Sequence, residues 1–275
     1  MTKTSYGAGD KQYWIFDPVQ VLGPVPVIVF LHGWGLLDPT QYSIWIEHLV
    51  KRGNVVVFPK FQDNILELTP NMTPNAVSAV QSAFVTLGSR ADRSRFAIVG
   101  HSIGASIAFD MSALAATAGL PAPTALMAAA PGGTTSFGWT GTGSLDQIPA
   151  NILALVLIGD EDTTVGDETA KALFASIPQV ACTNKNLLLV RSDRHGTPQL
   201  VASHAAPTAA AIGSNALDFY GYWKLSDALI GAAFYGSWRD YALGGGPNQT
   251  FMGTWSDGVP VAPLQIVRDG TCALP

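Results

Sequence analysis

The chain has 275 residues, of which 48% are hydrophobic and only 13% are charged, so the composition excludes an intrinsically disordered protein. The formal net charge is −5 and no block of like charges occurs, which leaves no basic face for a nucleic acid. No apolar run reaches the roughly 20 residues that a membrane-spanning helix needs. We therefore expect neither nucleic-acid binding nor a membrane span.

Short apolar runs alternate with helix-like stretches, which is typical of a parallel sheet with crossover helices. The predicted strands lie at 25–31, 54–58, 95–100, 124–130, 153–158 and 187–190, with an edge strand at 13–16. The predicted helices lie at 73–87, 102–118, 167–176 and about 215–231. No linker divides the chain, so we expect a single α/β domain over residues 1–275, with a C-terminal tail from about residue 235 packed on it.

A nucleophile motif follows the third of these strands. Gly100-His101-Ser102-Ile103-Gly104 fits G-x-S-x-G and stands between a strand pattern and an alanine-rich helix pattern. A turn this sharp strains the serine backbone and requires small residues on both sides, which the two glycines supply. The serine would then project above the sheet edge at a helix N-terminus, where negative charge is favoured. An ordinary βα turn can match this pattern by chance, but its context favours Ser102 as a nucleophile.

These residues resemble the nucleophile elbow of the α/β-hydrolases, and the resemblance extends over about residues 25–195. It implies a mostly parallel central sheet flanked by helices, and a catalytic triad in the chain order serine, acid, histidine. The acid in this family commonly stands in a G-x-x-D-x-x-V setting after the fifth strand. Gly159 and Val165 frame Asp162 in that way, so Asp162 is the predicted acid and Asp160 is the alternative.

A serine hydroxyl needs a base, and the chain offers five histidines. His32 and His101 resemble turn-shaping positions of the family, and His48 lies on a predicted helix. His195 and His204 both follow the sixth strand. His195 comes just beyond the strand end, where the family's base lies, and we predict it as the base, with His204 as the alternative.

Two backbone amides must stabilise the oxyanion that forms on the substrate. One is predicted to be the amide of Ile103, which follows the nucleophile. The segment His32-Gly33-Trp34-Gly35 resembles the family's oxyanion loop, and the amide of Trp34 is the predicted second donor. The two glycines would otherwise be simple turn residues. No zinc-ligand spacing and no dinucleotide motif occurs, so the sequence implies no metal and no cofactor.

The interval 131–151, between the fourth and fifth strands, is too short for the helical cap domain of many α/β-hydrolases. We therefore expect no large cap domain and an open site, which suits bulky acyl chains or a polymer surface. This layout is similar to cutinases, polyester hydrolases and dienelactone-hydrolase-like enzymes. Trp34, Phe137 and Trp139 are the predicted apolar substrate wall. The long tail with its aromatic stretch 219–223 departs from the cutinase pattern and forms either core or a lid.

The predicted function is hydrolysis of a small-molecule or polymeric carboxylic ester through an acyl-enzyme. Acyl transfer or cofactor-free perhydrolysis on the same triad is the alternative, and a non-catalytic binding protein with this fold is another. Cys182 and Cys272 are the two cysteines, and they form either a disulfide that closes a loop of about 90 residues or two reduced thiols. The pair and the low charge favour secretion over a cytoplasmic location. We expect the protein to be a monomer.

Overall fold

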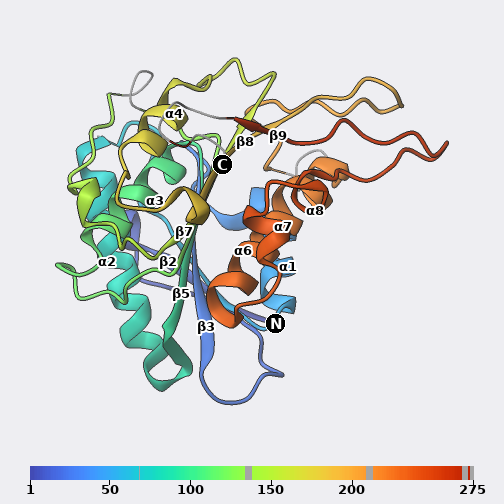
Figure 1. The fold of residues 1–275 in the computed structure, drawn as a ribbon. Coiled ribbons are helices and arrows are strands. Elements are labelled where there is room, and N and C mark those ends of the chain that lie inside the picture. The colour runs from blue at the N-terminus through green and yellow to red at the C-terminus, as the bar shows by residue number, and fades with distance from the viewer. Residues whose placement is uncertain (68, 134–137, 209–212, 268–271, 273–275) are drawn as a thin grey trace.

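The computed structural model describes residues 1–67, 69–133, 138–208, 213–267 and 272. Within these residues a nine-stranded sheet runs in the order β1-β2-β4-β3-β5-β6-β7-β8-β9 (Figure 1). The strands from β4 across to β8 are parallel, whereas β1, β2 and β9 pair antiparallel at the two edges. The strand bounds are β1 Thr2–Tyr6, β2 Tyr13–Asp17, β3 Val25–Leu31, β4 Val55–Pro59, β5 Ala91–His101, β6 Ala125–Ala129, β7 Leu153–Gly159, β8 Lys185–Val190 and β9 Gln265–Val267.

Helices cover both faces of the sheet. One face carries α2 (Thr69–Leu87), α3 (Ile103–Leu114) and α4 (Glu168–Ala175), and the other carries α1 (Ser43–Lys51) and α6 (Lys224–Tyr235). A π-helix (Leu217–Trp223) leads into α6, and α7 (Arg239–Leu243) and α8 (Pro247–Thr250) follow it. Short 3-10 helices lie at Gly9–Lys11, Pro39–Tyr42, Gly88–Arg90, Leu145–Gln147 and Cys182–Asn184.

A hydrophobic core lies on each face of the sheet, and alternate residues along each strand contribute side chains to the two cores. Along β3, Val27 and Val29 pack against the α2/α3 layer, whereas Ile28 and Phe30 pack against the α1/α6 layer. Successive side chains of a strand point to opposite faces, so a continuous run of apolar residues serves two layers at once. This arrangement confirms the predicted α/β-hydrolase fold with a mostly parallel sheet flanked by helices.

The structure differs from the predicted elements mainly at the sheet edges. The sequence does not predict the edge strands β1 and β9, because every residue of β1 is exposed and β9 has only three residues, so neither has a strong apolar pattern. Helix α2 begins at Thr69, earlier than predicted, and contains Pro74 in its interior. Between β6 and β7, the described residues include one short 3-10 helix, Leu145–Gln147.

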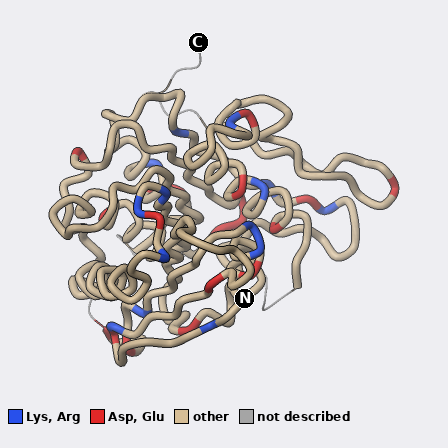
Figure 2. The backbone as a smooth tube through the Cα atoms, turned by 90° about the horizontal axis from the view of Figure 1, so that it is seen from below, with Lys and Arg blue, Asp and Glu red and all other residues tan. Residues whose placement is uncertain are grey.

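The C-terminal segment packs on the α1/α6 side of the sheet. Met252, Val261 and Leu264 are buried there. Cys272 instead packs against the α2/α3 core and forms a disulfide with Cys182. The segment that follows β8 and the segment between α8 and β9 extend beyond the helices on the right of Figure 1. Charged residues of both signs are interspersed along the described chain, as Figure 2 shows.

Candidate active site

Ser102 occupies a strained turn between β5 and α3. Its φ is +57° and its ψ is −127°, a conformation that costs a non-glycine residue about 1–3 kcal/mol. A Cβ on Gly100 would lie 2.3 Å from the carbonyl oxygen of Gly104, and a Cβ on Gly104 would lie 2.3 Å from that of His32. Both glycines are therefore required for the close approach of β3, β5 and α3 that holds the serine at the sheet edge.

Three side chains form a hydrogen-bonded chain at this edge. The Ser102 Oγ lies 2.8 Å from His204 Nε2, and His204 Nδ1 lies 2.7 Å from Asp162 Oδ2. The other carboxylate oxygen of Asp162 accepts hydrogen bonds from the amides of Thr164 and Val165 at 3.0 and 3.1 Å. Asp162 lies three residues beyond the end of β7, so the carboxyl end of that strand places it beside His204 and Ser102.

The electrostatics of Asp162 fix the tautomer of His204. Burial alone would raise the pKa of this carboxyl, but the hydrogen bonds from His204 and the two backbone amides outweigh burial and lower it. Asp162 is therefore an ionised acceptor, which places the imidazole proton on Nδ1 of His204. Nε2 is then free to accept the hydroxyl proton of Ser102, the arrangement of a nucleophile with its base and orienting acid.

Asp160, the alternative acid, has a different role. Its carboxylate accepts hydrogen bonds from the backbone amide of Ser192 at 2.9 Å and from the Ser192 hydroxyl at 2.6 Å. It therefore fastens the turn after β8 to the turn after β7. The structure brings Asp162, rather than Asp160, to His204.

The structure does not bring His195, the predicted base, to Ser102, and the histidine that contacts Ser102 is His204. His195 Nε2 is bonded to Asp257 Oδ2 at 2.7 Å, and its side chain is 42% exposed. The reason is a hairpin after β8, in which the backbones of Asp193 and Leu200 exchange two hydrogen bonds of 2.8 Å.

This hairpin carries His195 outward before the chain returns to the sheet edge. The return occurs at Ala202, whose carbonyl accepts a hydrogen bond from the amide of Glu161 at 3.2 Å. A Cβ on Gly159 would lie 2.1 Å from the same carbonyl, so the returning chain lies directly against the end of β7. His204 follows two residues later. The turn-forming residues Gly196 and Pro198 were the sequence signal for this detour.

The loop after β3 lies beside the nucleophile. A Cβ on Gly33 would be 3.3 Å from the Ser102 Cβ. The amide of Gly33 donates to the Tyr42 hydroxyl at 2.9 Å, and its carbonyl oxygen accepts from His32 Nδ1 at 2.7 Å. Because Nδ1 donates and burial lowers the pKa of His32 to about 4, this histidine is neutral.

The next peptide of this loop is also fixed. The amide of Gly35 donates to Gln62 Oε1 at 3.0 Å, and Gln62 is fully buried. Trp34 therefore lies between two anchored glycines, while Ile103 is the first residue of α3. Both residues that were predicted to supply oxyanion amides lie on segments adjoining Ser102.

The residues of the predicted aromatic wall differ in their burial. Trp34 is half-buried beside the site. Trp139 is 4% exposed and packs within the α2/α3 core, where it leaves almost no surface for a ligand. Phe137 lies outside the described residues. In the aromatic stretch 219–223, Tyr222 and Trp223 are buried core residues.

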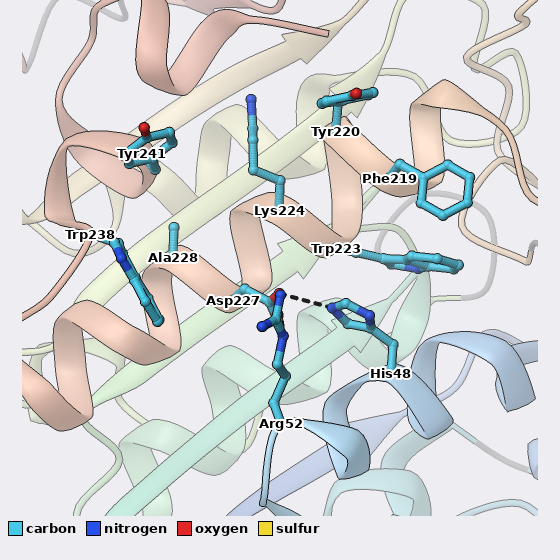
Figure 3. A pocket seen from close by; sticks show the side chains of 10 residues that line it. All are labelled: His48, Arg52, Phe219, Tyr220, Trp223, Lys224, Asp227, Ala228, Trp238 and Tyr241. Carbon is cyan, nitrogen blue, oxygen red and sulfur yellow. Dashed lines mark hydrogen bonds and ion pairs between the residues drawn. The ribbon is translucent and has the colours of Figure 1, made fainter. Parts of the chain in front are cut away.

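A separate cavity of about 470 Å³ lies on the outer side of α1 and α6 (Figure 3). Asp227 accepts hydrogen bonds there from His48 Nε2 at 2.9 Å and from Arg52 Nε at 3.0 Å. The lining residues are His48, Arg52, Phe219, Tyr220, Trp223, Lys224, Asp227, Ala228, Trp238 and Tyr241. Ser102 and its partners are not among them, so this cavity is distinct from the candidate active site.

Two further searches were restricted to the described residues. Among them, no cluster of three or more His, Cys, Asp or Glu side chains is arranged to hold a metal ion. No helix in the same part of the chain combines the length and apolar character needed to cross a membrane.

Comparison with known proteins gives one family. The model of a family described as chlorophyllase matches residues 2–140, half of the chain, which includes the loop after β3 and the Ser102 turn. No curated protein matches the sequence. Among solved structures, a crystal structure of a mutant of the esterase rPPE is 20% identical, with a TM-score of 0.49, and the match covers 69% of this chain and 72% of that one.

Proposed function

This chain belongs to the chlorophyllase family of hydrolases, and we propose that it is a serine esterase that cleaves carboxylic esters through an acyl-enzyme. The observation that carries the proposal is the hydrogen-bonded chain from Ser102 Oγ through His204 to Asp162, with distances of 2.8 and 2.7 Å. The strained backbone of Ser102 supports it, because such strain persists where a side chain must be presented for function.

In the proposed mechanism, His204 Nε2 takes the hydroxyl proton while Ser102 Oγ attacks the ester carbonyl carbon. Asp162 stabilises the imidazolium that results. The tetrahedral intermediate collapses, His204 returns the proton to the departing alcohol, and an acyl group remains on Ser102. Water, deprotonated by His204, then attacks the acyl-enzyme. When the second tetrahedral intermediate collapses, His204 returns this proton to Ser102 Oγ and the carboxylic acid leaves.

We assign stabilisation of the oxyanion in both steps to hydrogen bonds from the backbone amides of Trp34 and Ile103. The Ile103 amide begins α3, so the positive end of the helix dipole adds to its effect. The Trp34 amide lies in a loop whose neighbouring peptides are held by Tyr42 and Gln62. A donor that is fixed before the reaction needs no reorganisation when the charge develops.

For the substrate, we propose an ester with a bulky apolar acyl or alkyl part, polyesters included, with Trp34 contributing to the binding wall. The short interval between β6 and β7 supports an open site of this kind. The name of the family makes chlorophyll a further ester to test.

The test is an activity series with one matched variant. Purified enzyme would be assayed on p-nitrophenyl esters of increasing acyl length, on chlorophyll and on a polyester film. Ser102→Ala should abolish turnover of every substrate and prevent labelling by a fluorophosphonate, with an unchanged circular dichroism spectrum. Turnover retained by Ser102→Ala would refute the proposal.

Two other functions remain alternatives on the same fold. Acyl transfer or perhydrolysis would use the same acyl-enzyme with an alcohol or peroxide in place of water, so product analysis with these acceptors present distinguishes them. A non-catalytic binding protein would not be labelled by the fluorophosphonate. The hydrogen bond between Ser102 and His204 argues against this alternative.

We also propose that the protein is exported and monomeric. The disulfide between Cys182 and Cys272 supports export, because disulfides persist in oxidising compartments. Thiol titration of protein from its native source, together with light scattering after size exclusion, would test both statements. Two reduced thiols, or a dimer mass, would contradict them.

A further inference from the structure

His101 stands between the two halves of the candidate active site. Its Nδ1 lies 2.7 Å from the Tyr42 hydroxyl, and its Nε2 lies 2.9 Å from the backbone carbonyl oxygen of His204. The Tyr42 hydroxyl also receives the amide of Gly33 at 2.9 Å. One continuous set of hydrogen bonds therefore runs from the loop after β3 to the histidine that contacts Ser102.

Every proton in this set can be assigned from chemistry alone. A carbonyl oxygen only accepts, so His101 Nε2 must carry the proton that it donates to His204. His101 Nδ1 is then an acceptor, and Tyr42 must donate to it. The Tyr42 hydroxyl still has a lone pair for the amide of Gly33. No other distribution of protons on a neutral His101 satisfies all three contacts.

Burial keeps this arrangement in one protonation state. His101 is 2% exposed and Tyr42 is 1% exposed. Burial, reinforced by the nearby His204, lowers the pKa of His101 to about 3, and burial raises the pKa of Tyr42. His101 therefore stays neutral when His204 becomes an imidazolium, and its ring lies 4.9 Å from that of His204.

We propose that Tyr42 and His101 are positioning residues that hold the oxyanion loop and the catalytic histidine in a fixed relation to each other. Neither side chain is assigned to the reacting atoms. They act through the Gly33 peptide, which precedes the Trp34 amide, and through the backbone of His204. The inference rests on the proposed function and adds residues that the nucleophile motif and the triad do not identify.

Loss of the coupling should affect the transition state more than the bound ester. The oxyanion forms only during the reaction, so a displaced Trp34 amide or His204 ring lowers kcat and leaves KM nearly unchanged. Tyr42→Phe removes one hydroxyl, leaving the Gly33 amide without its acceptor and His101 Nδ1 without its donor. We expect kcat to fall by about tenfold to a hundredfold, the range for a small displacement of a catalytic group, with KM within threefold of the wild-type value.

Two substitutions at His101 separate the ends of the network. The Gln side chain of His101→Gln can place its amide nitrogen near the Nε2 position and keep the donor to His204, while the acceptor for Tyr42 is lost. His101→Asn keeps a polar group near the Nδ1 position and loses the donor. Since the coupling needs both ends, each variant should lose at least tenfold in kcat.

A double variant provides the sharpest test. Tyr42→Phe and His101→Gln break the same hydrogen bond, so the pair should be no more than about threefold slower than the slower single variant. Independent effects would multiply instead. Tyr13→Phe is the matched control, because it removes the hydroxyl of a buried tyrosine that is bonded to Thr86 near the β1 edge of the sheet, and its kcat should match wild type.

The outcomes distinguish this inference from the proposed function. Fluorophosphonate labelling and ester turnover of the wild-type protein test the proposed function, and they do not depend on the inference about Tyr42 and His101. If the wild type is active and folded Tyr42→Phe has at least half of its kcat, or if the double variant shows multiplied losses, the inference is wrong. Should Tyr42→Phe fail to fold, kcat of His101→Gln decides in the same way.

Discussion

The assignment of the base to His204 gives the most discriminating prediction. His204→Ala removes the acceptor that lies 2.8 Å from Ser102 Oγ and the partner of Asp162. In serine hydrolases the loss of the base costs about 10⁴-fold to 10⁶-fold in kcat, which corresponds to about 5–8 kcal/mol of transition-state stabilisation. Hydrolysis of p-nitrophenyl butyrate should therefore fall to near the background rate, with the protein still folded.

His195→Ala is the matched variant from the same region of the chain. Its side chain is 42% exposed, is bonded to Asp257 and lies beside the Trp255 ring, with 5.9 Å between the ring centroids. We expect kcat within twofold of the wild-type value and little change in melting temperature. The reasoning is refuted if His195→Ala loses a hundredfold or more while His204→Ala keeps more than a tenth of wild-type activity.

Three further predictions concern stability. Gly104→Ala would place a Cβ 2.3 Å from the His32 carbonyl oxygen, so we expect no soluble folded protein; a folded variant that still reacts with a fluorophosphonate would contradict this. Burial raises the pKa of Asp218 to about 6, so between about pH 4 and 6 this carboxyl is protonated in the folded protein and ionised in the unfolded chain. The free energy of unfolding therefore falls as the pH rises through this range. Asp218→Asn should therefore be about 1–2 kcal/mol more stable than wild type in denaturant titrations at pH 8 and equal to it at pH 3.5, and a pH-independent difference would be inconsistent with this. Cys272→Ser removes the disulfide to Cys182, which closes a loop with a sequence separation of 90. This should lower the free energy of unfolding by up to about 4–5 kcal/mol and leave kcat unchanged. An unaltered melting temperature would refute this prediction.

Sequence alone predicted the features that depend on local chain geometry. The alternation of apolar strands and helices predicted the parallel sheet, because each element buries its own pattern of side chains. Ser102 could be found because a strand, a turn with two glycines and a helix are contiguous in sequence. Asp162 could be placed because the turn after a parallel strand returns to the same sheet edge as the turn after its neighbour.

The tertiary structure decided what depends on the path of the chain between elements. The hairpin joining Asp193 and Leu200 determines that His204 contacts Ser102 and that His195 does not, and chain order is the same for either histidine. Trp139 is a core residue because it packs into the core on the α2/α3 side of the sheet, although its loop sequence is also typical of an exposed wall. Contacts between distant segments have no periodic signature in sequence, so only the folded chain shows which histidine contacts Ser102.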